Sequence, residues 1–149
     1  MRHPALLILS AMMFLMLSCD NSDRERNPYL REPQFSIDIN LNLPQYGSLN
    51  TPGSALYIGG NNVGIKGIIV YNQGFGTYLA WEATCPNHSP NNCSTLVVQD
   101  GVTAKCGCDD FLYSLVNGAL LNETEEGQRP YALLNYRASV NGTIITVYN

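Results

Sequence analysis

The apolar residues of this chain occur in short stretches typical of β-strands, and the clearest of these stretches shows a two-residue alternation with polar residues. The alternation is most regular over 35–43, where every second residue is Phe, Ile or Leu, and it predicts a strand with one buried face. Clusters of Gly, Pro and Asn then separate short runs rich in Val, Ile, Tyr and Thr, as in all-β domains. Further strands are expected at 54–58, 66–71, 77–83, 95–99, 102–105, 111–115, 131–139 and 143–148.

The last two expected strands are joined by Asn141 and Gly142. Both residues accept the positive φ angles of a two-residue type I′ turn, so segments 136–140 and 143–147 should pair as a hairpin. No stretch of about a dozen residues shows the period of a helix. The chain is therefore expected to form one antiparallel all-β domain over 35–149.

The N-terminus has the three parts of an export signal: Arg2, an apolar run over 5–17, and Ser18 before Cys19. The run is shorter than the roughly 20 residues of a membrane-spanning helix. The end of the run resembles the lipobox of bacterial lipoproteins, with Met16 where Leu is usual. The resemblance implies that residues 1–18 are removed and that Cys19 carries a thioether-linked lipid, with palmitate. The alternative is an ordinary secretory signal with a coincidental cysteine.

Removal of the signal makes an acidic chain more acidic. The 12 acids remain and the 8 Lys and Arg fall to 7 with Arg2, so the formal charge moves from −4 to −5, which does not favour a nucleic-acid partner. Residues 19–34 are charged, contain two prolines and lack an apolar period, so they predict a solvated, poorly ordered tether behind the lipidated Cys19. The predicted location is the cell envelope, facing the periplasm or the cell exterior, with the membrane as a partner through the lipid.

The four cysteines that follow Cys19 all lie within residues 85–108. Cys85 and Cys93 come after one expected strand, and Cys106 and Cys108 after another. We therefore expect two cysteine loops that face each other.

These loops resemble those of Rieske-type [2Fe-2S] domains, in which one loop carries Cys-x-His and a second Cys, and the other carries Cys-x-Cys-His. The resemblance covers 54–149 and implies an antiparallel β-sandwich with a small two-loop cysteine subdomain. Cys85 and Cys106 match the thiolate ligands of the cluster. Cys93 and Cys108 match the pair that forms a disulfide between the loops.

The histidines of the family are not matched. Asn87 stands where the first is expected, with His88 one residue beyond it, and Asp109 stands where the second belongs. Once His3 leaves with the signal, His88 is the only histidine. A site with two Cys and two His ligands therefore cannot be built.

A different metal site is the alternative, because Cys85, His88, Cys106 and Cys108 suit tetrahedral zinc or a three-Cys, one-His iron-sulfur cluster. An oxidising compartment and an even number of cysteines favour disulfides instead. Export of a cluster in folded protein would require a twin-arginine signal, and only Arg2 precedes the apolar run. The preferred interpretation is a degenerate site with no cofactor, in which Cys85 and Cys106 form a second disulfide.

The function predicted from these features is that of a non-catalytic accessory or interaction module with an envelope protein as its partner. The alternative is an electron-transfer or zinc-binding protein. Glu82, Asp109 and Asp110 have no Ser, His or Lys partner at a telling distance and are interpreted as solubilising charges, so the chain is not expected to be an enzyme. Trp81 is expected to pack beneath the cysteine loops.

Overall fold

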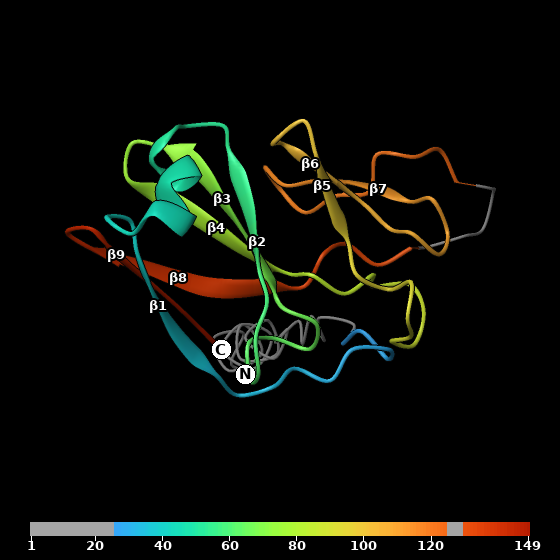
Figure 1. Ribbon diagram of the computed structural model, residues 1–149. Helices are drawn as coiled ribbons and strands as arrows, with labels where there is room; N and C mark the ends of the chain where they lie inside the picture. The colour runs from blue at the N-terminus through green and yellow to red at the C-terminus, as the bar shows by residue number, and fades with distance from the viewer. Residues whose placement is uncertain (1–25, 125–129) are drawn as a thin grey trace, which may run out of the picture.

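The computed structural model describes residues 26–124 and 130–149 (Figure 1). The predicted signal peptide, and Cys19 with its lipid, lie outside these residues. Within the described part of the chain, no helix is long and apolar enough to cross a membrane.

Six strands form one antiparallel sheet in the order β1-β9-β8-β4-β3-β2. Their bounds are β1 Ser36–Asn40, β2 Ala55–Ile58, β3 Ile68–Gly74, β4 Thr77–Glu82, β8 Asn135–Asn141 and β9 Ile144–Tyr148. The sheet curls, because side chains from both of its ends meet in one core: Ile39 of β1, Ile145 of β9 and Val70 of β3 belong to the same buried cluster.

A second, three-stranded sheet carries the cysteine subdomain. Its strands are β5 Val97–Gln99, β6 Thr103–Lys105 and β7 Leu112–Ser114, paired antiparallel in the order β5-β6-β7. Ala104 and Tyr113 face a second buried cluster that also contains Cys85 and Cys106. The predicted fold class is confirmed: the chain is all-β, with antiparallel sheets and a small two-loop cysteine subdomain.

Strand β3 joins the two cores because both of its faces are buried. Ile68 and Val70 point into the first cluster, while Ile69 and Tyr71 point into the second. Successive side chains of a strand point to opposite faces, so a stretch of strand that lies between two cores is apolar at consecutive positions, as β3 is over 68–71. Trp81 in β4 belongs to the second cluster and donates its indole N–H to the Leu115 carbonyl at 2.9 Å, as predicted for a residue beneath the loops.

The closing hairpin forms, but its turn is one residue later than expected. Asn141 pairs with Ile144, so the two loop residues are Gly142 and Thr143. Gly142 has a φ of 60°, whereas Asn141 and Thr143 are not among the residues with positive φ. The turn therefore resembles type II′, which requires positive φ only at its first central residue.

A short 3-10 helix, η2 Pro44–Asn50, follows β1 and was not predicted from the sequence. Pro44 supplies a favourable first residue, because its fixed φ suits a helix start. The helix buries only Leu49, and a single apolar residue leaves no period to detect. It caps the first core beside β2 and β3 (Figure 1).

Residues 26–34, here called the strap, are not the solvated tether that the sequence predicted. Leu30 is buried, and the Tyr29 ring meets the Tyr131 ring edge-on at 6.2 Å. The Asn27 side chain donates to the Pro86 carbonyl at 2.8 Å, next to Cys85. Such contacts are made by isolated side chains, which leave no periodic pattern in the sequence. The prediction of a tether therefore followed from the charged composition of the segment alone. The strap thus packs against the first cysteine loop.

Candidate functional site

Two loops, each of which follows a strand, carry the four cysteines. The first follows β4 and is closed by backbone bonds from the Cys85 N–H to the Ser94 carbonyl and from the Leu96 N–H to the Ala83 carbonyl, both 2.7 Å. The second follows β6 and is closed by a 2.8 Å bond from the Cys106 N–H to the Phe111 carbonyl. The cysteines are therefore held on short, locally closed turns at one end of the three-stranded sheet.

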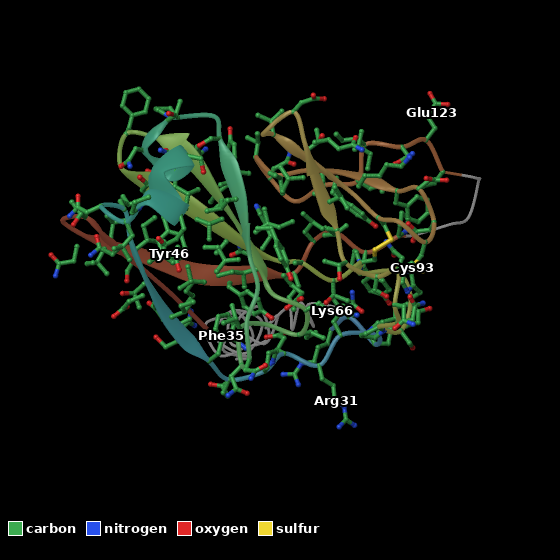
Figure 2. All side chains as sticks on the ribbon, viewed as in Figure 1. Arg31, Phe35, Tyr46, Lys66, Cys93 and Glu123 are labelled. Atoms are coloured by element: carbon green, nitrogen blue, oxygen red, sulfur yellow. A yellow bond between two sulfur atoms is a disulfide. The ribbon has the colours of Figure 1, made fainter. Side chains whose placement is uncertain are left out.

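Two disulfides connect these loops, and they are the two pairs predicted from the sequence. The inner disulfide joins Cys85 to Cys106, with Cα atoms 5.7 Å apart. The outer disulfide joins Cys93 to Cys108, with Cα atoms 5.3 Å apart (Figure 2). Both residues of the inner disulfide are fully buried, whereas both residues of the outer disulfide are exposed. The two bonds thus differ mainly in their access to solvent.

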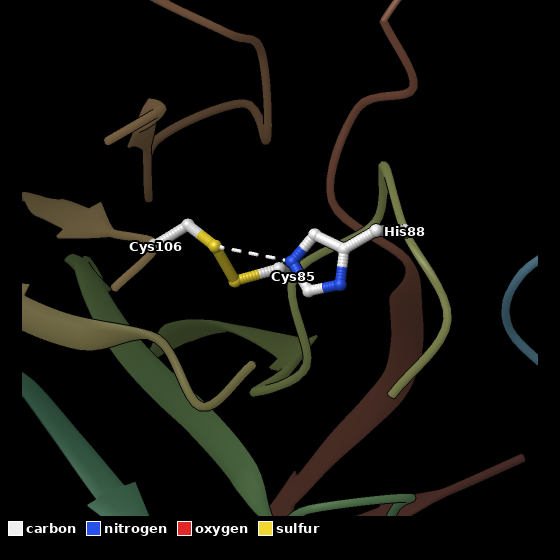
Figure 3. A group of neighbouring side chains, drawn as sticks. All are labelled: Cys85, His88 and Cys106. Atoms are coloured by element: carbon white, nitrogen blue, oxygen red, sulfur yellow. Dashed lines mark hydrogen bonds between the residues drawn. A yellow bond between two sulfur atoms is a disulfide. The ribbon is translucent and has the colours of Figure 1, made fainter. Parts of the chain in front are cut away.

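His88 lies beside the inner disulfide. Its Nε2 is 3.5 Å from the Cys106 sulfur (Figure 3), and its Nδ1 is 3.0 Å from the Ser89 carbonyl oxygen. Because a carbonyl oxygen only accepts hydrogen bonds, the neutral ring carries its proton on Nδ1. The lone pair on Nε2 then points towards the sulfur.

The alternative metal site predicted from the sequence is assembled only in part. The ligand atoms of Cys85, His88 and Cys106 lie within 4.8 Å of one another, but Cys108 is bonded to Cys93 and is not part of the group. The alternative set included Cys108 on the basis of spacing, whereas the preferred interpretation paired Cys108 with Cys93, as the structure does.

Asn87, which stands at the expected position of the first cluster histidine, is a structural cross-link. Its amide donates to the Tyr113 hydroxyl at 2.7 Å and to the Tyr131 carbonyl at 3.2 Å. Its side-chain oxygen accepts the Tyr131 N–H at 2.6 Å. Burial, followed by the nearby charge of Asp109, raises the pKa of Tyr113, so its hydroxyl stays protonated. The side chain of Asn87 thus points into the domain.

Asp109, at the expected position of the second histidine, also has a structural role within its own loop. Its carboxylate accepts the Phe111 N–H at 3.1 Å, a contact that shapes the turn after Cys108. Asp110 adopts a φ of 58° and forms an ion pair with Lys105 at 2.8 Å. Both acids therefore serve the loop conformation and the surface.

These residues do not fit a Rieske cluster. The two matching thiolates are bonded to each other, and the two positions for histidine hold an amide and a carboxylate that are engaged in hydrogen bonds. Only one imidazole approaches the sulfurs in the described residues. We therefore derive no chemistry for this chain through a cluster.

Glu82 is the polar residue whose role the sequence did not reveal. It is fully buried, and its carboxylate accepts hydrogen bonds from the Ile65, Lys66 and Thr84 N–H groups and from the hydroxyls of Thr84 and Tyr136, at 2.6–3.1 Å. Burial, then the Glu82 charge, raises the pKa of Tyr136. The interpretation of Glu82 as a solubilising charge was wrong, because partners 16 and 54 residues away leave no local pattern.

Comparison with known proteins finds likeness in structure only. No family model matches the sequence, and no curated protein matches it. Among solved structures, one chain of a complex of reduced oxygenase and oxidized ferredoxin in carbazole 1,9a-dioxygenase is similar. The alignment covers 77% of this chain and 94% of that chain, at 19% identity and a TM-score of 0.47.

Two further structures align in the same way. The ferredoxin of carbazole 1,9a-dioxygenase from Nocardioides aromaticivorans IC177 covers 68% of this chain and 91% of its own, at 18% identity and a TM-score of 0.42. A protein described as the small subunit of an NADH-dependent nitrite reductase from Mycobacterium tuberculosis covers 78% and 96%, at 15% identity and a TM-score of 0.44. At these identities and scores, no cofactor, activity or partner carries over to this chain.

Proposed function

We propose that this chain is a lipid-anchored accessory module of the cell envelope, held by a lipid on Cys19, with a non-catalytic Rieske-like domain that binds a protein partner. The lipobox-like Leu15 to Cys19 segment supports the anchor, and through it a location outside the cytoplasm. The inner disulfide carries the rest of the proposal, because it uses both sulfurs that a cluster would require.

The surroundings of the inner disulfide agree with a closed state, in which the cysteines are bonded to one another and have a structural role. Both sulfurs are buried in the second core, and the Cys108 N–H lies 3.4 Å from the Cys106 sulfur. Each disulfide contributes about 2–4 kcal/mol to stability, in the usual account by restricting the unfolded chain. In an oxidising compartment such bonds persist. The cysteines then stabilise a binding scaffold and transfer no electrons.

The experiment uses protein purified from its own cell envelope. Mass spectrometry of the mature chain should find acyl groups on Cys19, and thiol titration in denaturant should find no free thiol. Metal analysis and the visible spectrum should show neither iron nor charge-transfer bands. A stoichiometric two-iron centre, or four free thiols, would refute the closed state; an unmodified Cys19 would refute the anchor alone.

A second candidate function, binding of a single soft metal ion, is favoured by one observation. The lone pair on His88 Nε2 faces the Cys106 sulfur at 3.5 Å, close to the separation of two ligands on one tetrahedral zinc, given bond lengths of about 2.0 and 2.3 Å. A dithiol reductant would have to open the inner disulfide first. The disulfide accepts two electrons and two protons from the dithiol and becomes the Cys85 and Cys106 thiols, while the dithiol is oxidised to its own disulfide.

This second candidate has its own test. Cobalt(II) should produce tetrahedral d–d absorption bands only after full reduction, and the His88→Ala variant should lose them. A matched control is the Cys93→Ser, Cys108→Ser double variant, which should keep the bands because neither residue belongs to the ligand group. Equal spectra for the reduced parent chain and His88→Ala would exclude the site.

A further inference from the structure

A groove runs along the strap on the side where residues 131–137 pass beneath it. It consists of two adjoining hollows, of about 470 and 690 Å³, that share Arg26, Asn27, Glu32 and Asn149. Arg31 lines one of them and Arg137 the other. We call this feature the strap groove.

The charge of the strap groove is opposite to that of the protein. Among the side chains that line it, Arg26, Arg31 and Arg137 are positive and only Glu32 is negative, whereas the whole chain has a formal side-chain charge of −4. All three arginines are exposed. In the part of the chain that the structure describes, the one ion pair is Lys105 with Asp110, so none of the three guanidinium groups is neutralised there.

Arginines that form no ion pair with another described residue are well suited to phosphate. The planar guanidinium presents its N–H groups as a fork that matches two phosphate oxygens, and it is less strongly hydrated than an ammonium group. The groove is open to solvent along the strap, so a head group can enter without displacing any part of the described chain. An anionic ligand with exposed phosphate therefore suits this groove better than a neutral or cationic one.

The position of the strap relative to Cys19 identifies the source of the phosphate. Seven positions separate Cys19 from Arg26, and an extended chain spans at most about 3.6 Å per residue. A lipid on Cys19 would therefore hold the groove within roughly 25 Å of the bilayer surface. Glu123 lies on the opposite edge of the molecule from Arg31 (Figure 2), so an anionic surface would attract the strap and repel the far edge.

We propose that the strap groove binds the phosphates of anionic phospholipid head groups in the membrane that holds the chain, and thereby orients the domain with the strap towards the bilayer. This inference rests on the lipid anchor proposed above. It adds a second membrane contact to the lipid, made by the folded domain itself. Such a contact fixes which face of the domain is presented to a partner.

The test uses the full lipidated chain in vesicles, either of phosphatidylcholine alone or with phosphatidylglycerol added. Co-flotation with the phosphatidylcholine vesicles first establishes the anchor, independently of the groove. Hydrogen exchange of 26–35 and 131–137 is then compared between the two compositions. Phosphatidylglycerol should slow exchange in both segments, by about fivefold for each arginine engaged, and high salt should remove the effect.

Variants separate the groove from general charge effects. Arg31→Gln with Arg137→Gln should abolish the slowing, while Lys105→Gln, which removes one cation from the cysteine subdomain, should keep it. Equal exchange on the two vesicle types in a chain that co-floats would overturn the groove and leave the anchor intact. Slowing by inorganic phosphate on phosphatidylcholine vesicles, to the same extent as by phosphatidylglycerol, would assign the groove to a soluble anion and overturn the membrane contact.

Discussion

Replacement of Asn87 by alanine tests whether the expected histidine position is structural in this chain. The substitution removes three hydrogen bonds: two from the amide, to the Tyr113 hydroxyl and the Tyr131 carbonyl, and one from the Tyr131 N–H. Tyr113 is fully buried, and no buried side-chain N or O atom in the described residues lacks a partner. Asn87→Ala would leave the buried Tyr113 hydroxyl without the partner that it has in the structure.

The cost follows from these contacts. Each hydrogen bond contributes about 1 kcal/mol net, and a buried hydroxyl left without a partner costs about 1–3 kcal/mol. We expect Asn87→Ala to lower the free energy of unfolding by about 2–4 kcal/mol, in a domain whose total stability is of order 5–15 kcal/mol. The adjacent His88→Ala is the matched control. His88 is only half-buried and bonds the neighbouring Ser89 carbonyl, so its loss should change stability by about 0.5 kcal/mol or less.

The assay is urea unfolding of the oxidised protein, followed by Trp81 fluorescence. The slope of the free energy against urea should stay constant, so that the shift in midpoint reports stability. Equal urea midpoints for Asn87→Ala and the parent chain, or an equal loss of stability in Asn87→Ala and His88→Ala, would refute the structural role of Asn87. Position 87 would then be available for a ligand.

Three further predictions concern the disulfides and the core. Under native conditions a mild thiol reductant should open the outer disulfide well before the buried inner disulfide, an order that alkylation and mass spectrometry detect. Gly118→Ala should lower the free energy of unfolding by about 2–4 kcal/mol, because its Cβ would lie 2.7 Å from the Trp81 ring. Gly76 also has a positive φ but faces open space, so Gly76→Ala should lower it by only about 1–2 kcal/mol. Thermal melts of the two variants would show the difference. Because folding raises the pKa values of Tyr113 and Tyr136, the unfolded chain loses these protons first above pH of about 10. Stability should therefore fall as pH rises there, less steeply in Tyr136→Phe, as alkaline unfolding curves would show.

The strands could be predicted because they bury one or both faces over several residues. Alternation marked β1, whereas short runs rich in Val, Ile, Tyr and Thr between clusters of Gly, Pro and Asn marked β3 and β9. The disulfide partners could be predicted because the resemblance to the Rieske family implied the Cys93–Cys108 pair and left Cys85 and Cys106, at the positions of the thiolate ligands, to pair with each other. In each case the signal lies within a short stretch of sequence.

The strap and the role of Asn87 could not be predicted, because their partners are distant in sequence. Asn87 bonds residues 26 and 44 positions away, and Leu30 is the one buried residue in a segment that otherwise consists of charged residues, polar residues and two prolines. The composition of such a segment is that of a linker. Only the fold shows that its few apolar and amide side chains meet matching groups.

The departures from the Rieske pattern support one another, and this bears on whether a single change could restore a cluster. A histidine at position 87 offers one donor and one acceptor, so it could not replace the two donations and one acceptance that Asn87 makes. A histidine at position 109 would replace the carboxylate that accepts the Phe111 N–H by a bulkier and weaker acceptor, and neither change opens the inner disulfide. We therefore expect the Asn87→His, Asp109→His double variant to lose stability without gaining iron, because its sulfurs remain bonded to each other.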